Sequence, residues 1–161
     1  LSVLDSVLMG RVSYFGLKAG PEDYRAVEKI LEDMGLTTYA DRNVDALSGG
    51  ERQKIAIARA MAQEPKLMVF DEPTGNLDIA NEHLILAEAK KLAREKGIAV
   101  LSSLHDLNQA LSFGDKFFFL KDGIVKYTGG KEIFREEIIE DIFGLRVKIV
   151  EIENQKVILG G

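Results

Sequence analysis

Two adjacent carboxylates follow a short apolar run in the middle of the chain. Asp71 and Glu72 come directly after Lys66–Phe70, a run that predicts a buried strand. The carboxyl ends of parallel strands form the edge where ligands of open α/β sheets bind. At that edge Asp71 could hold Mg²⁺, directly or through water, while Glu72 orients or deprotonates an attacking water. A solvated acidic turn is the alternative, and Pro73 is compatible with it.

A loop one predicted helix earlier could bind an anion. Ser48 and Glu51 have the spacing of a capping box, which predicts a well-capped helix start. Between them, Gly49 and Gly50 leave backbone N–H groups unobstructed at the positive end of the helix dipole, next to the Ser48 hydroxyl. Plain helix capping is the alternative, and for an isolated loop it is the more common explanation.

The two histidines of the chain differ in their settings. His105 follows the apolar run Ile98–Ser102, which predicts a second strand, whereas His83 falls inside the predicted helix Asp78–Lys96 with no motif around it. A lone histidine after a strand is more often structural or exposed than functional. A role for His105 therefore depends on the motifs beside it, and we expect His83 to be a surface residue.

Helices that alternate with apolar runs would position these side chains. Strands separated by helices indicate βαβ units and a parallel sheet with helices on its faces. Helices are expected over Leu1–Arg11, Pro21–Met34, Lys54–Ala62, Asp78–Lys96, Asp106–Ser112 and Glu132–Phe143. Antiparallel hairpins are expected from Lys116–Leu120 with Ile124–Tyr127 across Asp122-Gly123, and from Arg146–Ile152 with Lys156–Leu159 across Asn154.

The composition argues against several classes of function. The 26 acidic and 21 basic residues are interspersed and give a formal charge of −5, which argues against a nucleic-acid-binding surface. Cysteine is absent, so disulfides and thiolate metal sites are excluded. No apolar run approaches the ~20 residues of a membrane-spanning helix, so any membrane role would be peripheral. With 46% hydrophobic residues, the 161-residue chain can bury a sizeable core.

The segments around Ser48 and Asp71 together resemble the signature loop and the Walker B strand of ABC ATPases. They read Leu47-Ser48-Gly49-Gly50-Glu51-Arg52-Gln53 and Leu67-Met68-Val69-Phe70-Asp71-Glu72-Pro73, in the family's order and at its short spacing. The resemblance implies ATP and Mg²⁺ as cofactors. It assigns ATP contacts to Ser48, Gly49, Gly50 and Gln53, the Mg²⁺ ion to Asp71, and the general-base role to Glu72.

Two further segments are similar to motifs of the same family. Asn76-Leu77-Asp78 matches its D-loop, which reaches across a dimer interface toward the partner's site, although Asp78 could also cap the helix that follows. Ser103–Asn108 looks like its switch loop, in which a histidine contacts the terminal phosphate. The resemblance therefore implies a nucleotide contact for Asp78 and a catalytic role for His105.

The family's phosphate-binding P-loop has no counterpart in this sequence. No string of the form G-x-x-x-x-G-K-[ST] occurs, and Leu1 opens directly into an apolar helical pattern, so we expect a cut chain. The expected fold is α/β, an incomplete P-loop NTPase fold whose parallel sheet is flanked by helices. The remainder of the helical subdomain is expected over 1–46, and the C-terminal part of the ATPase core, with its antiparallel hairpins, over 47–161. We expect such a chain neither to bind ATP tightly nor to hydrolyse it alone. We also expect its unpaired strand edges to favour self-association.

Other segments look like ATPase subunits of importers for iron-siderophore complexes, haem and cobalamin. They are Leu8-Met9-Gly10-Arg11, Tyr24–Gly35, Ala40-Asp41-Arg42 and Glu132–Val150. This resemblance implies a cytoplasmic protein, peripheral on the inner face of the cell membrane. Its implied partners are a second ATPase subunit, transmembrane permease subunits docked on Leu1–Leu36 and, indirectly, a substrate-binding protein.

The segment Thr74-Gly75-Asn76-Leu77 looks more like ATPases that serve lipoprotein and cell-division systems, which leaves the substrate undecided.

Two other functions remain open at the level of sequence. A soluble ABC ATPase acting in translation, cluster assembly or DNA repair is one alternative, although residues 1–47 lack the sustained heptads of repair members. A non-catalytic interaction domain with the same fold is the other, and the retention of Ser48, Asp71, Glu72 and His105 weighs against it.

Overall fold

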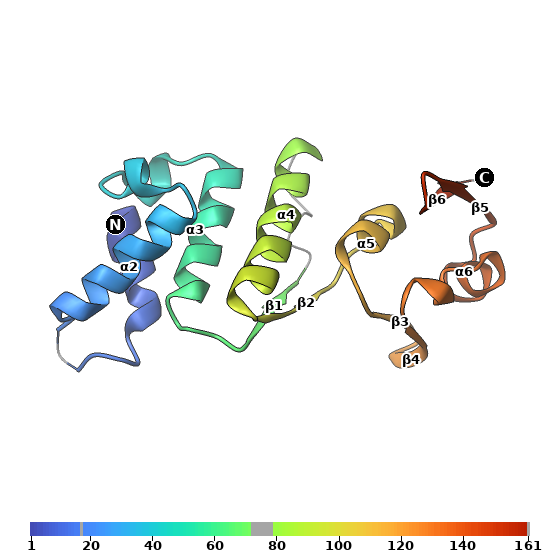
Figure 1. The fold of residues 1–161 in the computed structure, drawn as a ribbon, viewed down its shortest axis with the longest axis horizontal. Coiled ribbons are helices and arrows are strands. Elements are labelled where there is room, and N and C mark those ends of the chain that lie inside the picture. The colour runs from blue at the N-terminus through green and yellow to red at the C-terminus, as the bar shows by residue number, and fades with distance from the viewer. Residues whose placement is uncertain (17, 72–78, 161) are drawn as a thin grey trace. The chain divides into compact units, whose positions relative to one another are not determined.

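Two compact units make up the chain, Leu1–Ser103 and Leu104–Gly161. The computed structural model describes residues 1–16, 18–71 and 79–160, with only the backbone described over 79–84. Figure 1 shows the order of the helices and strands along the chain. Within the described ranges, no helix combines the length and the apolar character needed to cross a membrane.

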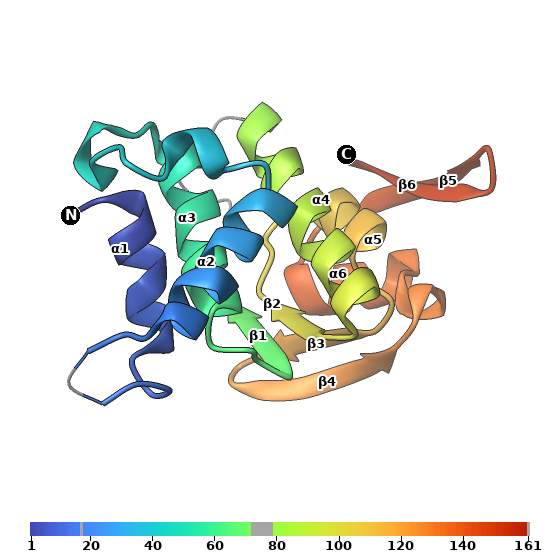
Figure 2. The same cartoon turned by 60° about the vertical axis from the view of Figure 1, so that its left-hand side comes forward.

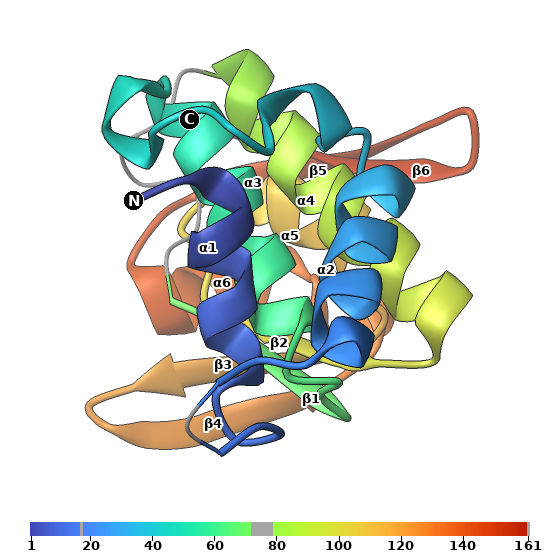
Figure 3. The same cartoon turned by 90° about the vertical axis from the view of Figure 1, so that its left-hand side faces the viewer.

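Three helices pack together in the first part of Leu1–Ser103. They are α1 (Val3–Leu8, continued by a 3₁₀ turn over Met9–Arg11), α2 (Pro21–Asp33) and α3 (Gly49–Met61). In Figure 3, α1 and α2 run side by side in front of α3. Their shared core contains Val3, Val7, Leu8, Val27, Leu31, Leu36, Leu47, Ile55, Ala58 and Ala62. The positions within the helices follow the three- and four-residue spacing of amphipathic helices, as the sequence predicts, while Leu36 and Leu47 come from the connection between α2 and α3.

Helix α1 and the 3₁₀ turn after it cross α3 at very close range, and Gly10 is the residue that permits the approach. A Cβ atom added at Gly10 would lie 2.1 Å from the carbonyl oxygen of Arg59 and 2.9 Å from the Cβ of Ala62. No real side chain fits at such distances without a shift of the backbone. Gly10 therefore sets the spacing between these two elements.

A parallel pair of strands follows the three helices. Strand β1 (Leu67–Phe70) pairs with β2 (Ala99–Ser102), with Leu67 opposite Ala99 and Phe70 opposite Ser102. Helix α4 (Ile79–Lys96) connects them, so the predicted βαβ unit is confirmed. As Figure 2 shows, α3 and α4 lie on the same side of this pair.

The prediction that Lys66–Phe70 is a buried strand was wrong for one of its two faces. Met68 is 5% exposed and packs with residues of α3 and α4, whereas Val69 is 65% exposed. Leu67 and Leu101 are also exposed. Successive side chains of a strand point to opposite faces, and the core of this unit forms on the face toward α3 and α4. An apolar run alone does not reveal whether both faces are covered.

The unit Leu104–Gly161 contains two short helices and two hairpins. Its elements are α5 (Leu107–Phe113), β3 (Phe117–Lys121), β4 (Ile124–Gly129), a 3₁₀ turn (Lys131–Ile133), α6 (Glu136–Phe143), β5 (Val147–Ile152) and β6 (Gln155–Gly160). Both predicted antiparallel hairpins are confirmed. Their turn residues, Asp122-Gly123 and Glu153-Asn154, all have positive φ, as tight hairpin turns require.

The expected continuous helix over Glu132–Phe143 is interrupted at Phe134 and Arg135. Both residues have extended backbone, and α6 begins only after them. Phe134 is 1% exposed, and its ring meets those of Phe117 and Phe119 edge-on at centroid distances of 4.7 and 5.0 Å. The extended backbone delivers this ring to the core. The aromatic packing thus outweighs the local preference for helix.

Candidate functional site

Residues Ser48–Glu51 form a complete helix cap at the start of α3. The Ser48 hydroxyl oxygen accepts a hydrogen bond from the Glu51 N–H over 3.3 Å. In return, the Glu51 carboxylate accepts one from the Ser48 N–H over 2.8 Å. The predicted capping box is therefore confirmed. It fixes the first turn of the helix and with it the orientation of Gly49 and Gly50.

The Glu51 carboxylate is stabilised as an anion by its neighbours. Its pKa is lowered, first by the hydrogen bond from the Ser48 backbone and then by bonds from the Ser48 and Tyr39 side chains, with a further contribution from the charge of Arg42. The Arg42 guanidinium lies over the Tyr39 ring, 4.6 Å from its centroid. The segment before the loop thus supports the cap that follows it.

The start of α3 has the features of an anion-binding site. The capping box uses the N–H groups of Ser48 and Glu51 and neither of those of Gly49 and Gly50. Those two donors stand at the positive end of a 13-residue helix, where Ser48 and Gly49 are exposed and Gly50 is buried. Gln53, half-buried, follows Gly49 by four residues and so lies one turn further along the same side of the helix. The exposed groups of Ser48 and Gly49 could therefore donate hydrogen bonds to an anion such as a phosphate group.

Asp71 lies where the sequence predicts it, immediately after β1. Its Oδ1 accepts a hydrogen bond from the Ser103 hydroxyl over 2.9 Å, and the Ser103 N–H donates to the Phe70 carbonyl over 3.0 Å. The ends of the two parallel strands are thereby joined, and the carboxylate is oriented at the sheet edge. Carboxylate oxygens are the protein ligands that Mg²⁺ takes, so Asp71 fits a magnesium site.

Ser103 is a site residue that the sequence reasoning did not single out. It stands one position after β2, and Asp71 stands one position after β1. Since Phe70 and Ser102 are opposite in register, the next residues of the two strands meet. Extending the predicted parallel pairing by one residue would have found this contact.

The other predicted site residues divide into two groups. Glu72 and Asp78 lie outside the described residues, so their roles stay predictions. His105 is an exposed residue near the start of Leu104–Gly161, directly before Asp106, whose Oδ1 accepts a hydrogen bond from Gln109 N–H over 2.7 Å and caps α5. The expected position of His105, between a strand and a helix, is confirmed, and its contact with phosphate is untested.

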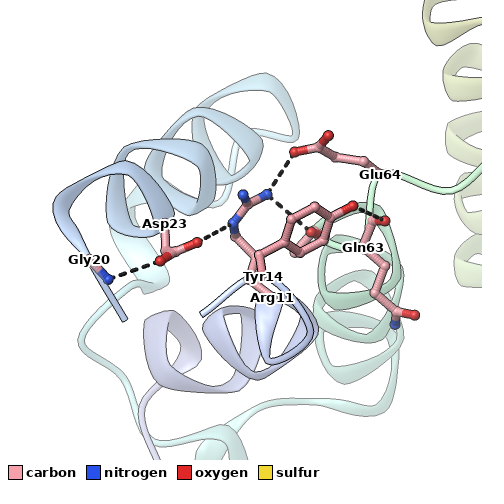
Figure 4. Close-up of polar contacts among 7 residues, drawn as sticks. Arg11, Tyr14, Gly20, Asp23, Gln63 and Glu64 are labelled. Atoms are coloured by element: carbon pink, nitrogen blue, oxygen red, sulfur yellow. Dashed lines mark hydrogen bonds and ion pairs between the residues drawn. The ribbon is translucent and has the colours of Figure 1, made fainter. Parts of the chain in front are cut away.

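A buried arginine ties α1, α2 and the end of α3 together (Figure 4). Arg11, 8% exposed, donates from Nε to Asp23 over 2.9 Å and from Nη1 to Glu64 over 2.8 Å and to the Ala62 carbonyl over 3.3 Å. Glu64 and Asp23, in that order, raise the pKa of Arg11. The Gly20 N–H lowers the pKa of Asp23, and Arg11 adds to this effect.

Tyr14 completes this cluster from the other side of Arg11. The guanidinium lies 4.4 Å from the centroid of the Tyr14 ring, and the Tyr14 hydroxyl donates to the Gln63 carbonyl over 2.9 Å. The cluster holds the end of α3 that is opposite to Ser48–Gly50. Sequence reasoning missed it because an arginine with partners far away in the chain carries no local signal.

Comparisons with known proteins agree with this geometry. A family model described as ABC transporter matches residues 3–75. The chain is 36% identical over 159 residues to the uncharacterized ABC transporter ATP-binding protein MJ0089 of Methanocaldococcus jannaschii, covering 99% of this chain and 63% of that protein. It is 44% identical over 131 residues to the ferric enterobactin transport ATP-binding protein FepC of Escherichia coli, covering 81% and 48%. It is 33% identical over 150 residues to the phosphonates import ATP-binding protein PhnC of Alcaligenes faecalis, covering 89% and 54%.

Solved structures give the same result for the fold. An ABC transporter in an inward-facing conformation, described as being of metal-chelate type, matches with a TM-score of 0.91 and 33% identity, over 100% of this chain and 67% of that one. The dimeric structure of MJ0796, a bacterial ABC transporter cassette, matches with a TM-score of 0.65 and 35% identity, over 81% and 56%. The expected α/β fold, a partial P-loop NTPase fold, is confirmed. The chain spans between about half and two thirds of the length of these relatives.

Proposed function

Because this chain belongs to the ABC transporter family, we propose that it forms the signature-loop and carboxylate part of an ATP-hydrolysing importer subunit. One observation carries the proposal: α3 bears a capped Ser48-Gly49-Gly50 start, and the chain from its other end leads directly into the strand that presents Asp71. In a dimer of such subunits the helix start would offer donors to the phosphates of one ATP, and the carboxylate would hold the Mg²⁺ ion of the other.

Each site residue has a definite part in this proposal. Ser48, Gly49, Gly50 and Gln53 would contact the phosphates of an ATP molecule held mainly by a second subunit. Asp71, oriented by the Ser103 hydroxyl, would hold Mg²⁺, which neutralises phosphate charge. Glu72 would act on the attacking water, His105 on the terminal phosphate, and Asp78 across the dimer interface.

We propose that Leu1–Leu36 docks on transmembrane permease subunits. Large apolar side chains on this segment are exposed, among them Met9, Val12, Tyr14 and Tyr24. Beside them a shallow hollow is lined by Arg11, Tyr14, Gly20, Pro21, Glu22, Asp23 and Arg25. Exposed apolar residues with a polar surround are typical of a protein interface. The subunit would thereby be peripheral on the cytoplasmic face of the membrane.

The proposed substrate class is a metal chelate such as an iron-siderophore, haem or cobalamin. Two likenesses support it: the identity to FepC exceeds that to PhnC, and a metal-chelate type transporter matches over the entire chain. Uptake of a phosphonate is the second candidate, because PhnC proteins occur repeatedly among the relatives. A substrate-binding protein would deliver either ligand to the permease.

Calorimetric titration with MgATP tests what this chain does alone. Since no P-loop string occurs among its 161 residues, we expect no binding heat and no phosphate release. Micromolar binding would mean that the chain holds a phosphate cradle of another kind. The proposed division of the site between two segments would then be wrong.

A chimera tests the catalytic part of the proposal. A P-loop segment from a related ABC ATP-binding protein would be fused ahead of Leu1, and phosphate release from MgATP would be measured. We expect turnover that Glu72→Gln lowers by at least about a hundredfold, because the water loses its base, with little change in ATP binding. A folded chimera that binds MgATP without turning it over would favour the non-catalytic alternative.

A further inference from the structure

The side chain of Asn108 forms two hydrogen bonds with one residue of the C-terminal hairpin. Its Nδ2 donates to the Ile158 carbonyl over 2.9 Å, and its Oδ1 accepts from the Ile158 N–H over 2.8 Å. The side-chain amide thus takes the place that the backbone of a neighbouring strand would take beside β6. A residue in α5 is thereby joined to a strand 50 positions later in the chain.

The β6 end of this contact is fixed by packing. Ile158 is 7% exposed and belongs to the hydrophobic core of Leu104–Gly161. Strand β6 pairs with β5 in uninterrupted register from Val147 opposite Gly160 to Ile152 opposite Gln155. Asn108 itself is exposed, so water could satisfy its amide. Its two bonds to one backbone position therefore reflect the placement of α5 rather than a need created by burial.

The α5 end of the contact lies next to His105. Asn108 is three residues after the histidine, and only the capping residue Asp106 and the first helical residue Leu107 intervene. Helix α5 has seven residues, which is too short to be stable without tertiary contacts. The position of the loop before it therefore depends in part on what holds the helix, and Asn108 gives the helix two hydrogen bonds to the hairpin.

We propose that Asn108 is a positioning residue for His105, and that it acts by fastening α5 to strand β6. The inference rests on the proposed function, in which His105 contacts the terminal phosphate. It makes the C-terminal hairpin a support of the catalytic apparatus, although the hairpin is not assigned any contact with nucleotide. A partner that displaced β6 from Asn108 would loosen the histidine loop and slow hydrolysis.

Nuclear magnetic resonance on the 161-residue chain tests the inference without ATP. In Asn108→Ala we expect the amides of α5 and of Ile158 to exchange at least about tenfold faster with solvent, and the imidazole signals of His105 to shift. In Asn108→Asp the ionised carboxylate would repel the Ile158 carbonyl at neutral pH, with a similar acceleration. At about pH 3, where the carboxyl group is mostly protonated, the same side chain regains a donor and should return toward the wild-type rate measured at that pH.

A matched control removes a different side-chain bond from the same helix. Ser112 donates to the Gln109 carbonyl within α5, so Ser112→Ala removes this bond and leaves both bonds between Asn108 and Ile158 in place. We expect it to leave the amide of Ile158 and the imidazole of His105 unchanged. Unchanged His105 signals in Asn108→Ala, or equal acceleration in Asn108→Asp at both pH values, would overturn the inference. Inactivity of the chimera would count against the proposed function alone, because these spectra do not depend on ATP.

Discussion

The two candidate parts of the nucleotide site are built in different ways. The start of α3 is held by a reciprocal cap of its own and by Tyr39 and Arg42 from the preceding segment, with a core of three helices behind it. The edge that carries Asp71 belongs to two strands that pack on one face and leave Leu67, Val69 and Leu101 exposed on the other. The signature loop is therefore supported locally, whereas the sheet edge depends on one-sided packing. Self-association through the unpaired strand edges of this sheet remains a prediction, and size-exclusion chromatography can test it.

Of the two regions, the three-helix region should lose more stability when a single atom is added to it. In Gly10→Ala the new Cβ would meet the Arg59 carbonyl at 2.1 Å, so one of the two backbones must move. We expect a loss of about 3 kcal/mol in the free energy of unfolding, measured by urea denaturation. Gly16→Ala is the matched control, because nothing lies within 4 Å of the added Cβ there. Equal effects of the two changes would contradict the close crossing of α1 and α3.

Strand β1 should respond differently at two neighbouring residues. Met68→Ala removes a side chain packed against α3 and α4, and we expect a loss of about 2 to 3 kcal/mol. Val69→Ala, on the exposed face, should cost less than about 1 kcal/mol. Urea denaturation of both variants measures the difference. Similar losses would show that the second face of β1 is covered in solution.

Much of this architecture could be predicted from the sequence because its signals are local. Apolar spacing gave the helices, Asp122-Gly123 gave a hairpin turn, and Ser48 with Glu51 gave the start of α3. The predictions that were wrong depend on which distant segments of the chain pack on a residue. Phe134 breaks a predicted helix to reach two aromatic rings, and Val69 is exposed although its run is apolar.

The same distinction applies to the candidate site. Its residue types and their order could be identified from short motifs, and Asp71 lies where the strand was expected to end. The Ser103–Asp71 bond and the Arg11 cluster could not be identified in this way, since each joins residues that are more than ten positions apart. A motif indicates what a side chain can do, and its tertiary partners decide how it is held.

Removing the cap of α3 tests whether the signature loop is locally supported. In Ser48→Ala the Glu51 N–H loses its side-chain acceptor, and we expect a loss of about 1 kcal/mol in the free energy of unfolding. Ser48→Thr keeps an oxygen at the same position and should recover most of it. Hydrogen exchange of the first turn of α3 would report the fraying directly. An unchanged exchange rate would mean that the core behind the helix, rather than the cap, holds the loop.

The smallest expected effect is a pH dependence that Glu51 imposes on the same cap. The folded protein lowers the pKa of Glu51, mainly through the Ser48 N–H, so the ionised carboxylate is the stabilising form. Its contribution is complete above the pKa of glutamate in the unfolded chain, about 4.3, and is lost as the pH falls through the lower folded value. The stability difference between wild type and Glu51→Gln should therefore be present at pH 7 and shrink in acid, as urea denaturation at a series of pH values would measure. Because the amide oxygen introduced by Glu51→Gln could still accept the Ser48 N–H, this comparison isolates the charge from the hydrogen bond. A difference that did not change with pH would mean that the charge of Glu51 contributes nothing to the start of α3, and that the geometry of the cap alone sets the loop.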